Sequence, residues 1–406
     1  MRALVKKKPT NPPQWYEGLE LKDKPEPQVS AERPVKLNII SAGICGTDVG
    51  IYQGKDALAN AMAKLSTDEV ITGHEFCGRV AELHPSARIF IAQLLLRRRN
   101  TTPDVMAYCQ GKTVDELARD ENFEAFLNKH FYASAEMHFT CGRCLQCRTG
   151  HEHVCKKTIG KGMHEDGAFT EYMVIPANRL VLFEDGEISP DIISFMDALG
   201  NAVHTAQSAD LVGKNILITG AGVQGLGSCA VARQLGANRI YVTDAQAAAG
   251  AGSVIDKLAI ATKLGADAVF NVATEAGREE LRDTIAQDTD NTGVDVVFEM
   301  SGNYRAYEQM FENVRMGGTI LLLGLPAGAL TVDFSKNIIF KGLTIRGIYG
   351  RRVFDTWDLM RYLLGNGLED IILKSGIITH RLPIADFETG FQALISGEAV
   401  KVLLKP

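Results

Sequence analysis

The pattern of hydrophobic and polar positions changes near residue 186. Beyond this point, apolar runs of strand length alternate with helical or loop segments. Such alternation is typical of a parallel sheet with helices on both faces. The runs are NILITG, RIYVTD, DAVFNV, DVVFEM, TILLLGL and LTIRGIY. We therefore expect a doubly wound α/β domain over residues 186–349.

The first 185 residues have a different pattern. Short β-rich runs such as VKLNIISAGI and EFCGRVAELH are broken by glycine and proline, as expected of an irregular β domain. The tail, residues 350–406, returns to a mixed pattern, and we expect it to rejoin the first domain. The sequence contains no internal repeat and no low-complexity tract.

Residues 86–131 do not fit a compact β domain. The Thr102-Pro103 pair and the box Thr113-x-x-Glu116 both have the form of a helix N-terminus, and apolar residues beyond the box keep near-helical spacing. We predict a small helical insertion here. Its three consecutive arginines, at positions 97–99, are interpreted as a solvated face rather than a phosphate site.

Composition narrows the class of protein. The 406 residues are 46% hydrophobic and 23% charged, which fits a globular protein of two or three domains. A net charge of -6 gives no indication of nucleic acid or an anionic membrane as a partner. The N-terminal segment lacks the apolar core of a secretory signal, and no apolar stretch reaches the length of a spanning helix. We expect a cytoplasmic protein.

The run CGRCLQC, closed by a later cysteine, is the most specific motif in the chain. Two Cys-x-x-Cys steps let thiolates converge on one ion, and a fourth cysteine completes a tetrahedral shell with no open position. Such a shell binds a structural zinc. The alternative, two disulfides in a secreted protein, is disfavoured by the cytosolic character of the chain. The four residues are Cys141, Cys144, Cys147 and Cys155.

A dinucleotide motif opens the second domain. In NILITGAGVQG, Gly220, Gly222 and Gly225 follow an apolar strand and precede a helix, which allows a pyrophosphate to approach the helix N-terminus. The next strand ends in Asp244, which can bind both ribose hydroxyls and repel a 2′-phosphate, and this favours NAD over NADP. A glycine turn without a ligand is the alternative. The segment AQAAAGAGSVI after Asp244 is long for this turn and would loosen the adenosine site.

A second, open metal site is predicted from ICGTDVG and GHEFCG. Cys45 supplies a thiolate, and His74 with Glu75 supplies an imidazole and a carboxylate after a glycine that permits a sharp turn. Three ligands from separate segments suit a catalytic zinc that keeps a position for substrate. Taken alone, these residues would be interpreted as a buried thiol and a capping pair.

Several longer motifs extend this reasoning to a family. The chain resembles the zinc-containing medium-chain dehydrogenases, and among them the threonine dehydrogenases, to which GNAVHTA and GIYGR followed by F-x-T-W are specific. The resemblance covers most of the chain outside 86–131. Its motifs are AGICGTDV, GHEF, AEMHFTCGRCLQC, TIGKGMHEDGAFTEYMVIP, MDALGNAVHTA, FEMSG, FKGLTIRGIYGRRVFDTW and IITHRLPIADF.

The resemblance implies an architecture. Residues 1–185 would form a GroES-like catalytic domain with a structural zinc lobe and the helical insertion. Residues 186–349 would form a Rossmann domain that binds NAD, and residues 350–406 would return to the catalytic domain. A catalytic and a structural zinc in each subunit, and a homotetramer, are also implied.

The resemblance also implies roles for single residues. Cys45, His74 and Glu75 match the catalytic zinc site, and Thr47 matches a hydroxyl that relays a proton. Asp197 matches an acidic residue near the metal, either a transient ligand or part of the relay, and His138 matches a histidine of the substrate pocket. The residues that match NAD contacts are Gln224, Asp244, Lys257 (where the family has an arginine), Leu323, Gly324, Leu325, Ile348 and Tyr349.

The implied reaction is zinc-dependent oxidation of the secondary hydroxyl of L-threonine by NAD to 2-amino-3-oxobutanoate. Glu136, Asp197 and His138 are the candidates for binding the substrate ammonium. A polyol or vicinal-diol dehydrogenase with the same zinc chemistry is the first alternative. A family member that has lost catalysis is the second, and it is disfavoured because the metal ligands and Thr47 are present.

Two features depart from the family pattern. The family motif reads CGTDVH, in which the histidine passes the proton from the cofactor ribose to solvent; this chain has Gly50 at that position. The insertion also replaces a short Gly-Asp-Arg-Val connection. We expect proton release directly to water, with His130 of the insertion as the alternative acceptor.

Overall fold

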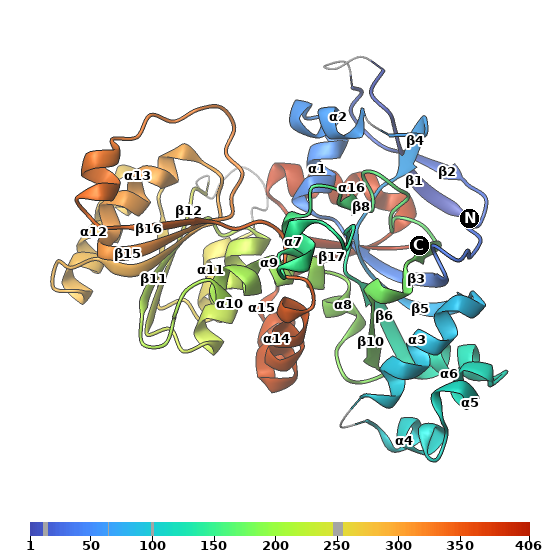
Figure 1. Cartoon of the computed structure of the whole chain (residues 1–406). Helices are drawn as coiled ribbons and strands as arrows, with labels where there is room; N and C mark the ends of the chain where they lie inside the picture. The colour runs from blue at the N-terminus through green and yellow to red at the C-terminus, as the bar shows by residue number, and fades with distance from the viewer. Residues whose placement is uncertain (11–14, 64, 99–100, 247–254) are drawn as a thin grey trace.

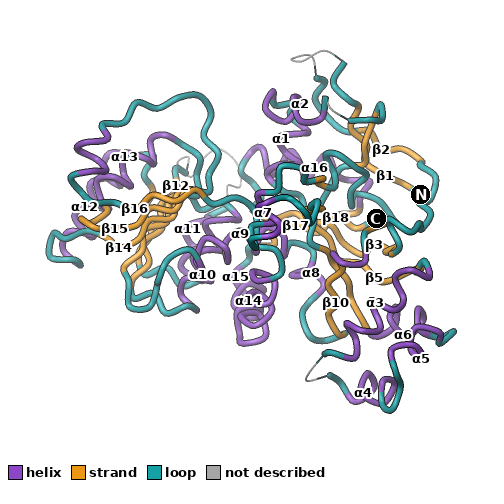
Figure 2. The backbone as a smooth tube through the Cα atoms, viewed as in Figure 1, coloured by secondary structure: helices purple, strands orange, loops and turns teal. Residues whose placement is uncertain are grey.

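The structure is a computed structural model, and it describes residues 1–10, 15–63, 65–98, 101–246 and 255–406. Two sheets organise the chain, one in each half of the molecule (Figure 1). Figure 2 shows the second sheet enclosed by helices, whereas loops make up much of the first half. No helix in the described ranges is long and apolar enough to span a membrane.

The second half contains a parallel sheet with the strand order β13-β12-β11-β14-β15-β16. The chain begins at β11 in the middle of the sheet, adds β12 and β13 on one side, and then crosses over to add β14, β15 and β16 on the other side. This is the arrangement of a doubly wound dinucleotide-binding fold. All the apolar runs predicted as strands are strands, so this prediction is confirmed. The strands are β11 (Asn215–Thr219), β12 (Arg239–Asp244), β13 (Ala268–Asn271), β14 (Val294–Glu299), β15 (Val314–Leu322) and β16 (Thr344–Gly347).

Helices cover both faces of this sheet because their apolar sides pack on its buried strands. Leu226 and Val231 of α10 join one core cluster, and Leu281 and Ile285 of α12 join another on the opposite face. The helices of this half and of the segment that follows it are α9 (Met196–Gln207), α10 (Val223–Gln234), α11 (Lys257–Lys263), α12 (Glu275–Asp288), α13 (Tyr304–Asn313), η3 (Ser335–Ile339), α14 (Asp355–Leu363), η4 (Leu364–Leu368) and α15 (Glu369–Ser375). The short helix α8 (Pro190–Ile193) packs instead against β3, β5 and β6 of the first sheet.

The first half is β-rich, as predicted. A sheet of order β10-β6-β5-β3-β18-β17, with β9 also on β3, lies next to a smaller sheet of order β2-β1-β4. Its elements are β1 (Arg2–Lys7), β2 (Glu20–Asp23), β3 (Val35–Gly43), α1 (Gly46–Tyr52), α2 (Asp56–Met62), β4 (Glu69–Ile71), β5 (Glu75–Leu83), β6 (Phe131–Ala135), β9 (Tyr172–Ile175), η2 (Ala177–Arg179) and β10 (Leu180–Glu184).

The C-terminal segment returns to this first sheet. Figure 1 shows the red end of the chain among the blue strands of the N-terminal half. β18 (Lys401–Lys405) pairs antiparallel with β3 through Leu403 opposite Gly43 and parallel with β17 (Ile378–Pro383). η5 (Ile384–Asp386) and α16 (Phe387–Ser396) connect these two strands. The exact domain boundaries at 185 and 349 stay predictions.

The segment between β5 and β6 is helical. It contains α3 (Pro85–Leu96), α4 (Pro103–Cys109), α5 (Val114–Arg119) and α6 (Phe123–His130). Thr102 and Thr113 are the N-cap residues of α4 and α5, as predicted, and Glu116 completes the capping box by accepting a hydrogen bond from the Thr113 N–H at 2.7 Å. The helices pack through buried Leu117, Phe123 and Leu127.

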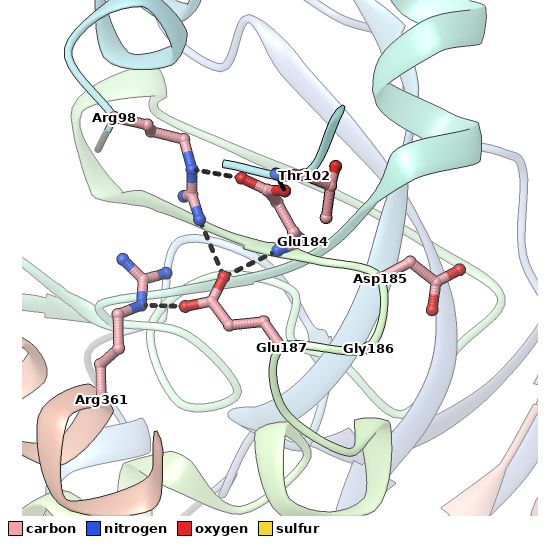
Figure 3. A pocket seen from close by; sticks show the side chains of 7 residues that line it. All are labelled: Arg98, Thr102, Glu184, Asp185, Gly186, Glu187 and Arg361. Carbon is pink, nitrogen blue, oxygen red and sulfur yellow. Dashed lines mark hydrogen bonds and ion pairs between the residues drawn. The ribbon is translucent and has the colours of Figure 1, made fainter. Parts of the chain in front are cut away.

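The interpretation of the arginines as a solvated face is wrong for Arg98. Its guanidinium lies 2.8 Å from Glu187 and 3.4 Å from Glu184, while Arg361 of α14 lies 2.8 Å from the other oxygen of Glu187 (Figure 3). These residues line a cavity of about 480 Å³ in which each arginine is neutralised by a glutamate. Ion pairs therefore fix the insertion against β10 and α14. Arg97 is exposed, and position 99 lies outside the described residues.

Candidate active site

Three predicted metal ligands meet where β3 ends and β5 begins, in the middle of the first sheet. Cys45 is the N-cap residue of α1, His74 lies in the turn after β4, and Glu75 begins β5. Their ligand atoms lie within 4.8 Å of one another. The arrangement brings together one sulfur, one nitrogen and one oxygen, a donor set that suits zinc with a further position for substrate.

Two glycines allow the three ligands to approach one another. Gly73 has φ +89°, so it supplies the left-handed turn that delivers His74, and a Cβ there would collide with the Phe169 ring. Gly43 pairs with Glu75 across β3 and β5, and a Cβ at Gly43 would collide with the Glu75 carboxylate. The sharp turn expected from the glycine before the His-Glu pair is therefore present.

The electrostatics of the cluster fit a cation. Burial opposes a positive charge on His74, but Asp48 and Cys45 outweigh it and raise the pKa of His74 well above 6.5. Oε1 of Glu75 is buried and has no hydrogen-bond partner among the described residues. Since an unsatisfied buried carboxylate oxygen is costly, a metal ion at this point would complete its coordination.

Lys401 holds the other oxygen of Glu75. Its ammonium donates to Glu75 Oε2 at 2.7 Å and to the Ile44 carbonyl at 2.9 Å, and both charged side chains are fully buried. Burial lowers the pKa of Lys401, but Glu75, Cys45 and Asp48 together outweigh this effect and raise it. The pair fixes the orientation of Glu75 and leaves its first oxygen toward the cluster.

Thr47 lies in the first turn of α1, two residues after Cys45. In the same turn, Asp48 accepts a hydrogen bond from the Cys45 N–H at 3.0 Å and lies 3.4 Å from His74 Nδ1. Gly50, farther along the helix, is buried, and a Cβ there would lie 2.6 Å from Leu58 Cδ1. His130 stacks on Phe126 at the far end of β6, with the whole strand between it and Glu136, which disfavours it as a proton acceptor at this site.

A buried ionic network adjoins the cluster. Arg351 donates to Glu136 through Nη2 at 2.8 Å and Nε at 3.1 Å, and its Nη2 lies 2.6 Å from Asp197 Oδ2. Glu136 also accepts from His138 at 2.7 Å and from Trp357 Nε1 at 2.8 Å. Burial alone would raise the pKa of Glu136, but Arg351 and His138 hold it well below 4.5.

This network separates the three candidates for ammonium binding. Glu136 is fully buried, and both of its oxygens are engaged by protein donors, so the suggestion that it binds substrate is not supported. Asp197 is 9% exposed, and its negative charge contributes to raising the pKa of Glu75. His138 lies at the start of β7 (His138–Phe139), with its ring 6.2 Å from that of Tyr349.

The second metal candidate is the four-cysteine cluster. Cys144 Sγ lies 3.4 Å from Cys147 Sγ and 3.8 Å from Cys155 Sγ, distances longer than a disulfide bond of about 2.05 Å. The disulfide alternative is therefore wrong for this structure. The lobe contains α7 (Leu145–Arg148), η1 (Glu152–Val154) and β8 (Ile159–Gly160).

The electrostatics of these thiols are compatible with a shared cation. Backbone N–H groups of Arg143 and Cys144 lower the pKa of Cys141 to about 6. Burial and the neighbouring thiols raise the pKa of Cys147 to about 12. A thiolate at one cysteine thus disfavours ionisation of the next, and a zinc ion bound by all of them relieves this repulsion.

The predicted dinucleotide cleft lies at the carboxyl ends of β11 and β12. Gly222 is the N-cap residue of α10, and Gly220 has φ +94°; a Cβ on Gly225 would collide with the Gly220 carbonyl. Asp244 ends β12, and its carboxylate accepts a hydrogen bond from the Ala221 N–H at 3.3 Å. Gln224 Oε1 is buried without a hydrogen-bond partner among the described residues, so a ligand donor would satisfy it.

The other residues predicted to contact NAD lie around the same edge. Leu323, Gly324 and Leu325 follow β15, and Leu325 is 93% exposed. Ile348, buried, and Tyr349, exposed, follow β16. Lys257 is the first residue of α11. Most of the segment AQAAAGAGSVI lies outside the described residues, so its effect on the adenosine site stays a prediction.

Comparison with known families agrees with this geometry. Residues 224–364 match the zinc-binding dehydrogenase model, and residues 31–94 and 133–185 match the alcohol dehydrogenase GroES-like domain. The unmatched segment between the two GroES-like parts, residues 95–132, coincides with most of the helical insertion. The chain is thus a zinc-binding dehydrogenase with a GroES-like domain and a Rossmann-type sheet.

Relatives aligned over the full length specify the branch of this family. L-threonine 3-dehydrogenases from Shewanella woodyi and Shewanella loihica are 37% and 38% identical to this chain, and each alignment covers 100% of the chain and 99% of the relative. The chain belongs to the L-threonine 3-dehydrogenase family. A solved alcohol dehydrogenase from Thermotoga maritima shares the fold, with a TM-score of 0.76 at 23% identity, over 100% of this chain and 99% of that one.

Sequence reasoning missed two residues that organise the site, Lys401 and Arg351. Lys401 lies in the last strand, and its partner Glu75 is 326 positions away. Arg351 stands in the motif GIYGRRVFDTW, which was recognised as family-specific without a role for its arginine. One signal was available for Lys401. It begins the strand KVLLK, in which the next three residues are apolar, and a lysine so close to a buried run usually has a partner if it is buried as well.

Proposed function

We propose that this chain oxidises the secondary hydroxyl of L-threonine with NAD and yields 2-amino-3-oxobutanoate. The observation that carries the proposal is the convergence of Cys45, His74 and Glu75, with Asp197 near enough for its charge to contribute to the raised pKa of Glu75. An open three-ligand metal site next to a carboxylate suits a substrate that has both a hydroxyl and an ammonium group. The full-length similarity to L-threonine 3-dehydrogenases supports the same substrate.

In this proposal, Cys45, His74 and Glu75 hold a catalytic zinc, and the loops at the ends of β11, β12 and β15 hold NAD. The zinc would supply Lewis acidity that lowers the pKa of the substrate hydroxyl, and NAD would supply the hydride acceptor. The four-cysteine lobe would hold the structural zinc, away from the reaction.

The side chains of the protein position the substrate and move its proton. Asp197, fixed on one oxygen by Arg351, would accept hydrogen bonds from the ammonium of threonine. The Thr47 hydroxyl would take the proton of the substrate hydroxyl toward solvent. His138 and Tyr349 would close the pocket between substrate and cofactor, which keeps donor and acceptor in contact and excludes water.

The test is an absorbance assay of NADH formation with a panel of L-threonine, 2,3-butanediol and sorbitol. We expect L-threonine to give the highest kcat/KM. Asp197→Asn should raise the KM for L-threonine more than the KM for the diol, because only the amino acid has an ammonium group to lose its partner. A higher kcat/KM with the diol or the polyol would favour the alternative substrate class.

The cofactor prediction concerns Asp244. Its carboxylate, at the end of β12, would bind the adenosine ribose and repel a 2′-phosphate, so NAD should be strongly preferred over NADP. Asp244→Ala should lower the ratio of kcat/KM with NAD to kcat/KM with NADP by about tenfold or more. A tenfold change corresponds to roughly 1.4 kcal/mol. Comparable kcat/KM with NADP in the unmodified protein would contradict the assignment.

A further prediction concerns Gly50, which has no side chain to relay a proton. A positioned general base contributes about a hundred- to ten-thousandfold to rate. Without one, turnover should be slow at neutral pH, rise toward alkaline pH and increase when imidazole is added. Gly50→His should raise neutral turnover and reduce the response to imidazole.

The space around Gly50 sets the design of this test. Because a Cβ at Gly50 would meet Leu58, the histidine variant is best made together with Leu58→Ala, and Leu58→Ala alone is the control. Unchanged turnover and unchanged pH dependence in the double variant would show that proton release does not limit the rate.

We also propose a cytoplasmic homotetramer. The thiols in the described residues are free, which suits a reducing compartment. β16 is the edge strand of its sheet, and all its residues are exposed, so its unpaired backbone groups are available to a second copy of the chain. Light scattering of the purified protein would measure the assembly, and a monomer would contradict this proposal.

A further inference from the structure

A buried carboxylate lies beneath the proposed dinucleotide cleft. Glu299 is the last residue of β14 and is fully buried. Its Oε1 accepts hydrogen bonds from the Ser301 N–H at 2.9 Å and the Gly302 N–H at 3.0 Å, and also from the Ser301 hydroxyl. Thr219, at the end of β11, donates to the same oxygen at 3.4 Å. This one oxygen therefore joins the ends of two neighbouring strands.

The backbone of Glu299 joins a third strand end. Its carbonyl accepts from the N–H groups of Leu323 and Gly324, both at 3.0 Å. These residues follow β15 and belong to the segment 323–325 that is proposed to contact NAD. Glu299 is thus bonded to the segments after β11, β14 and β15, which are adjacent in the sheet.

The three segments pack backbone against backbone. A Cβ at Gly220 would lie 2.9 Å from Ser301 Cα, and a Cβ at Gly302 would lie 2.9 Å from the Leu325 nitrogen. A Cβ at Gly324 would lie 2.5 Å from Glu299 Oε2. With so little room, a shift of the turn 300–302 would displace segment 323–325, and the Glu299 carboxylate is the group that holds this turn.

The charge of Glu299 is the unexplained feature. Burying a carboxylate is costly, and Oε2 has no hydrogen-bond partner among the described residues. Hydrogen bonds to an ionised acceptor are roughly twice as strong as those to a neutral one. A charged carboxylate here would strengthen the hydrogen bonds that hold the turn 300–302, and this turn packs directly against Leu325.

We propose that Glu299 is the positioning residue of the nicotinamide half of the cleft. It acts through segment 323–325 and does not touch the cofactor. The inference rests on the proposed function, in which this segment contacts NAD. The adenosine half, over β11 and β12, depends instead on the glycine turn and Asp244, so loss of the Glu299 charge should affect the two halves unequally.

The experiment measures binding to the zinc-loaded protein without turnover. Glu299→Gln keeps the shape of the side chain and removes its charge. NADH probes both halves of the cleft, and AMP probes the adenosine half alone; calorimetry gives both dissociation constants. We expect the dissociation constant of NADH to rise by about tenfold and that of AMP to change less than about twofold.

The matched control is Asp295→Asn. Asp295 lies at the opposite end of β14 and also bridges the two neighbouring strands, because it accepts from the Asn215 N–H at 2.9 Å and from Arg315 at 2.8 Å. The Asp295→Asn variant should therefore leave the dissociation constants of NADH and AMP unchanged. If Glu299→Gln does not fold, Ser301→Ala removes one donor to the carboxylate, and a smaller rise, about threefold, for NADH alone is expected.

The outcomes are distinguishable. If the unmodified protein binds neither probe, the proposed function is wrong. If it binds both and Glu299→Gln binds NADH equally well, the positioning role is overturned. An equal loss of NADH and AMP, or the same loss in Asp295→Asn, would assign Glu299 to general stability of the sheet and would also overturn the inference.

Discussion

Replacing Arg351 by methionine is expected to destabilise the protein by about 3–5 kcal/mol, because Glu136 and Asp197 would keep their charges in a buried site without their cation. Thermal unfolding should show this as a fall of roughly 5–10 °C in the melting temperature. Activity should fall as well, since Asp197 loses the contact that orients it. Arg351→Lys keeps the charge but not the forked geometry, and we expect an intermediate loss.

The neighbouring arginine provides the control. Arg352 is about half exposed and pairs with Asp355 at 2.7 Å on the surface, so Arg352→Met should cost less than about 0.5 kcal/mol. Equal losses in the two variants would contradict the buried network as the cause.

The pH dependence of stability follows from Glu136. Its folded-state pKa lies well below 4.5, whereas the unfolded value is the ordinary one. Its contribution to the free energy of unfolding is therefore complete above pH 4.5 and is lost as the pH falls toward the folded-state pKa. The difference in stability between the unmodified protein and Arg351→Met should be largest near neutral pH and should shrink in acid.

Replacing Cys144 by serine should cost the protein its structural metal. A closed thiolate shell contributes its binding free energy to folding, so loss of one ligand should lower the zinc content by about half and destabilise the lobe by several kcal/mol. Metal analysis and thermal unfolding measure the two effects. Mild chelation of the unmodified protein should remove activity before structure, because the site at Cys45 is open and exchanges more readily.

The insertion offers a matched cysteine for this experiment. Cys109, in α4, is partly buried and lies outside both metal candidates, so Cys109→Ser should leave zinc content unchanged. If Cys144→Ser kept the zinc content and melting temperature of the unmodified protein, the cluster would not be a structural metal site.

The sequence predicted those features whose cause is local. The spacing of the four cysteines, the capping box at Thr113 and the glycine turn at Gly220 each involve residues a few positions apart, so the chemistry is visible in a short window. The inner strands of the parallel sheet, such as β11 and β12, were predictable for a related reason: strands buried on both faces form continuous apolar runs.

Partners distant in the sequence were not predictable. Arg351 reaches Glu136 across 215 positions, and no local pattern distinguishes a buried arginine from an exposed one. Arg98 shows the same limit. A run of three arginines is typical of a solvated face, but the fold brings Glu184 and Glu187 into ion pairs with Arg98. Charge pairing of this kind depends on tertiary contacts that only the structure supplies.

The position of β18 has a consequence for the order of events during synthesis. The parallel sheet is complete in the sequence at Gly347, whereas the first sheet receives β17 and β18 only afterwards. Since domains fold as units while the chain emerges, the second half can fold first, and the N-terminal half must wait with a gap in its sheet. During that interval Glu75 lacks Lys401, so we expect the proposed metal site at Cys45, His74 and Glu75 to be completed last.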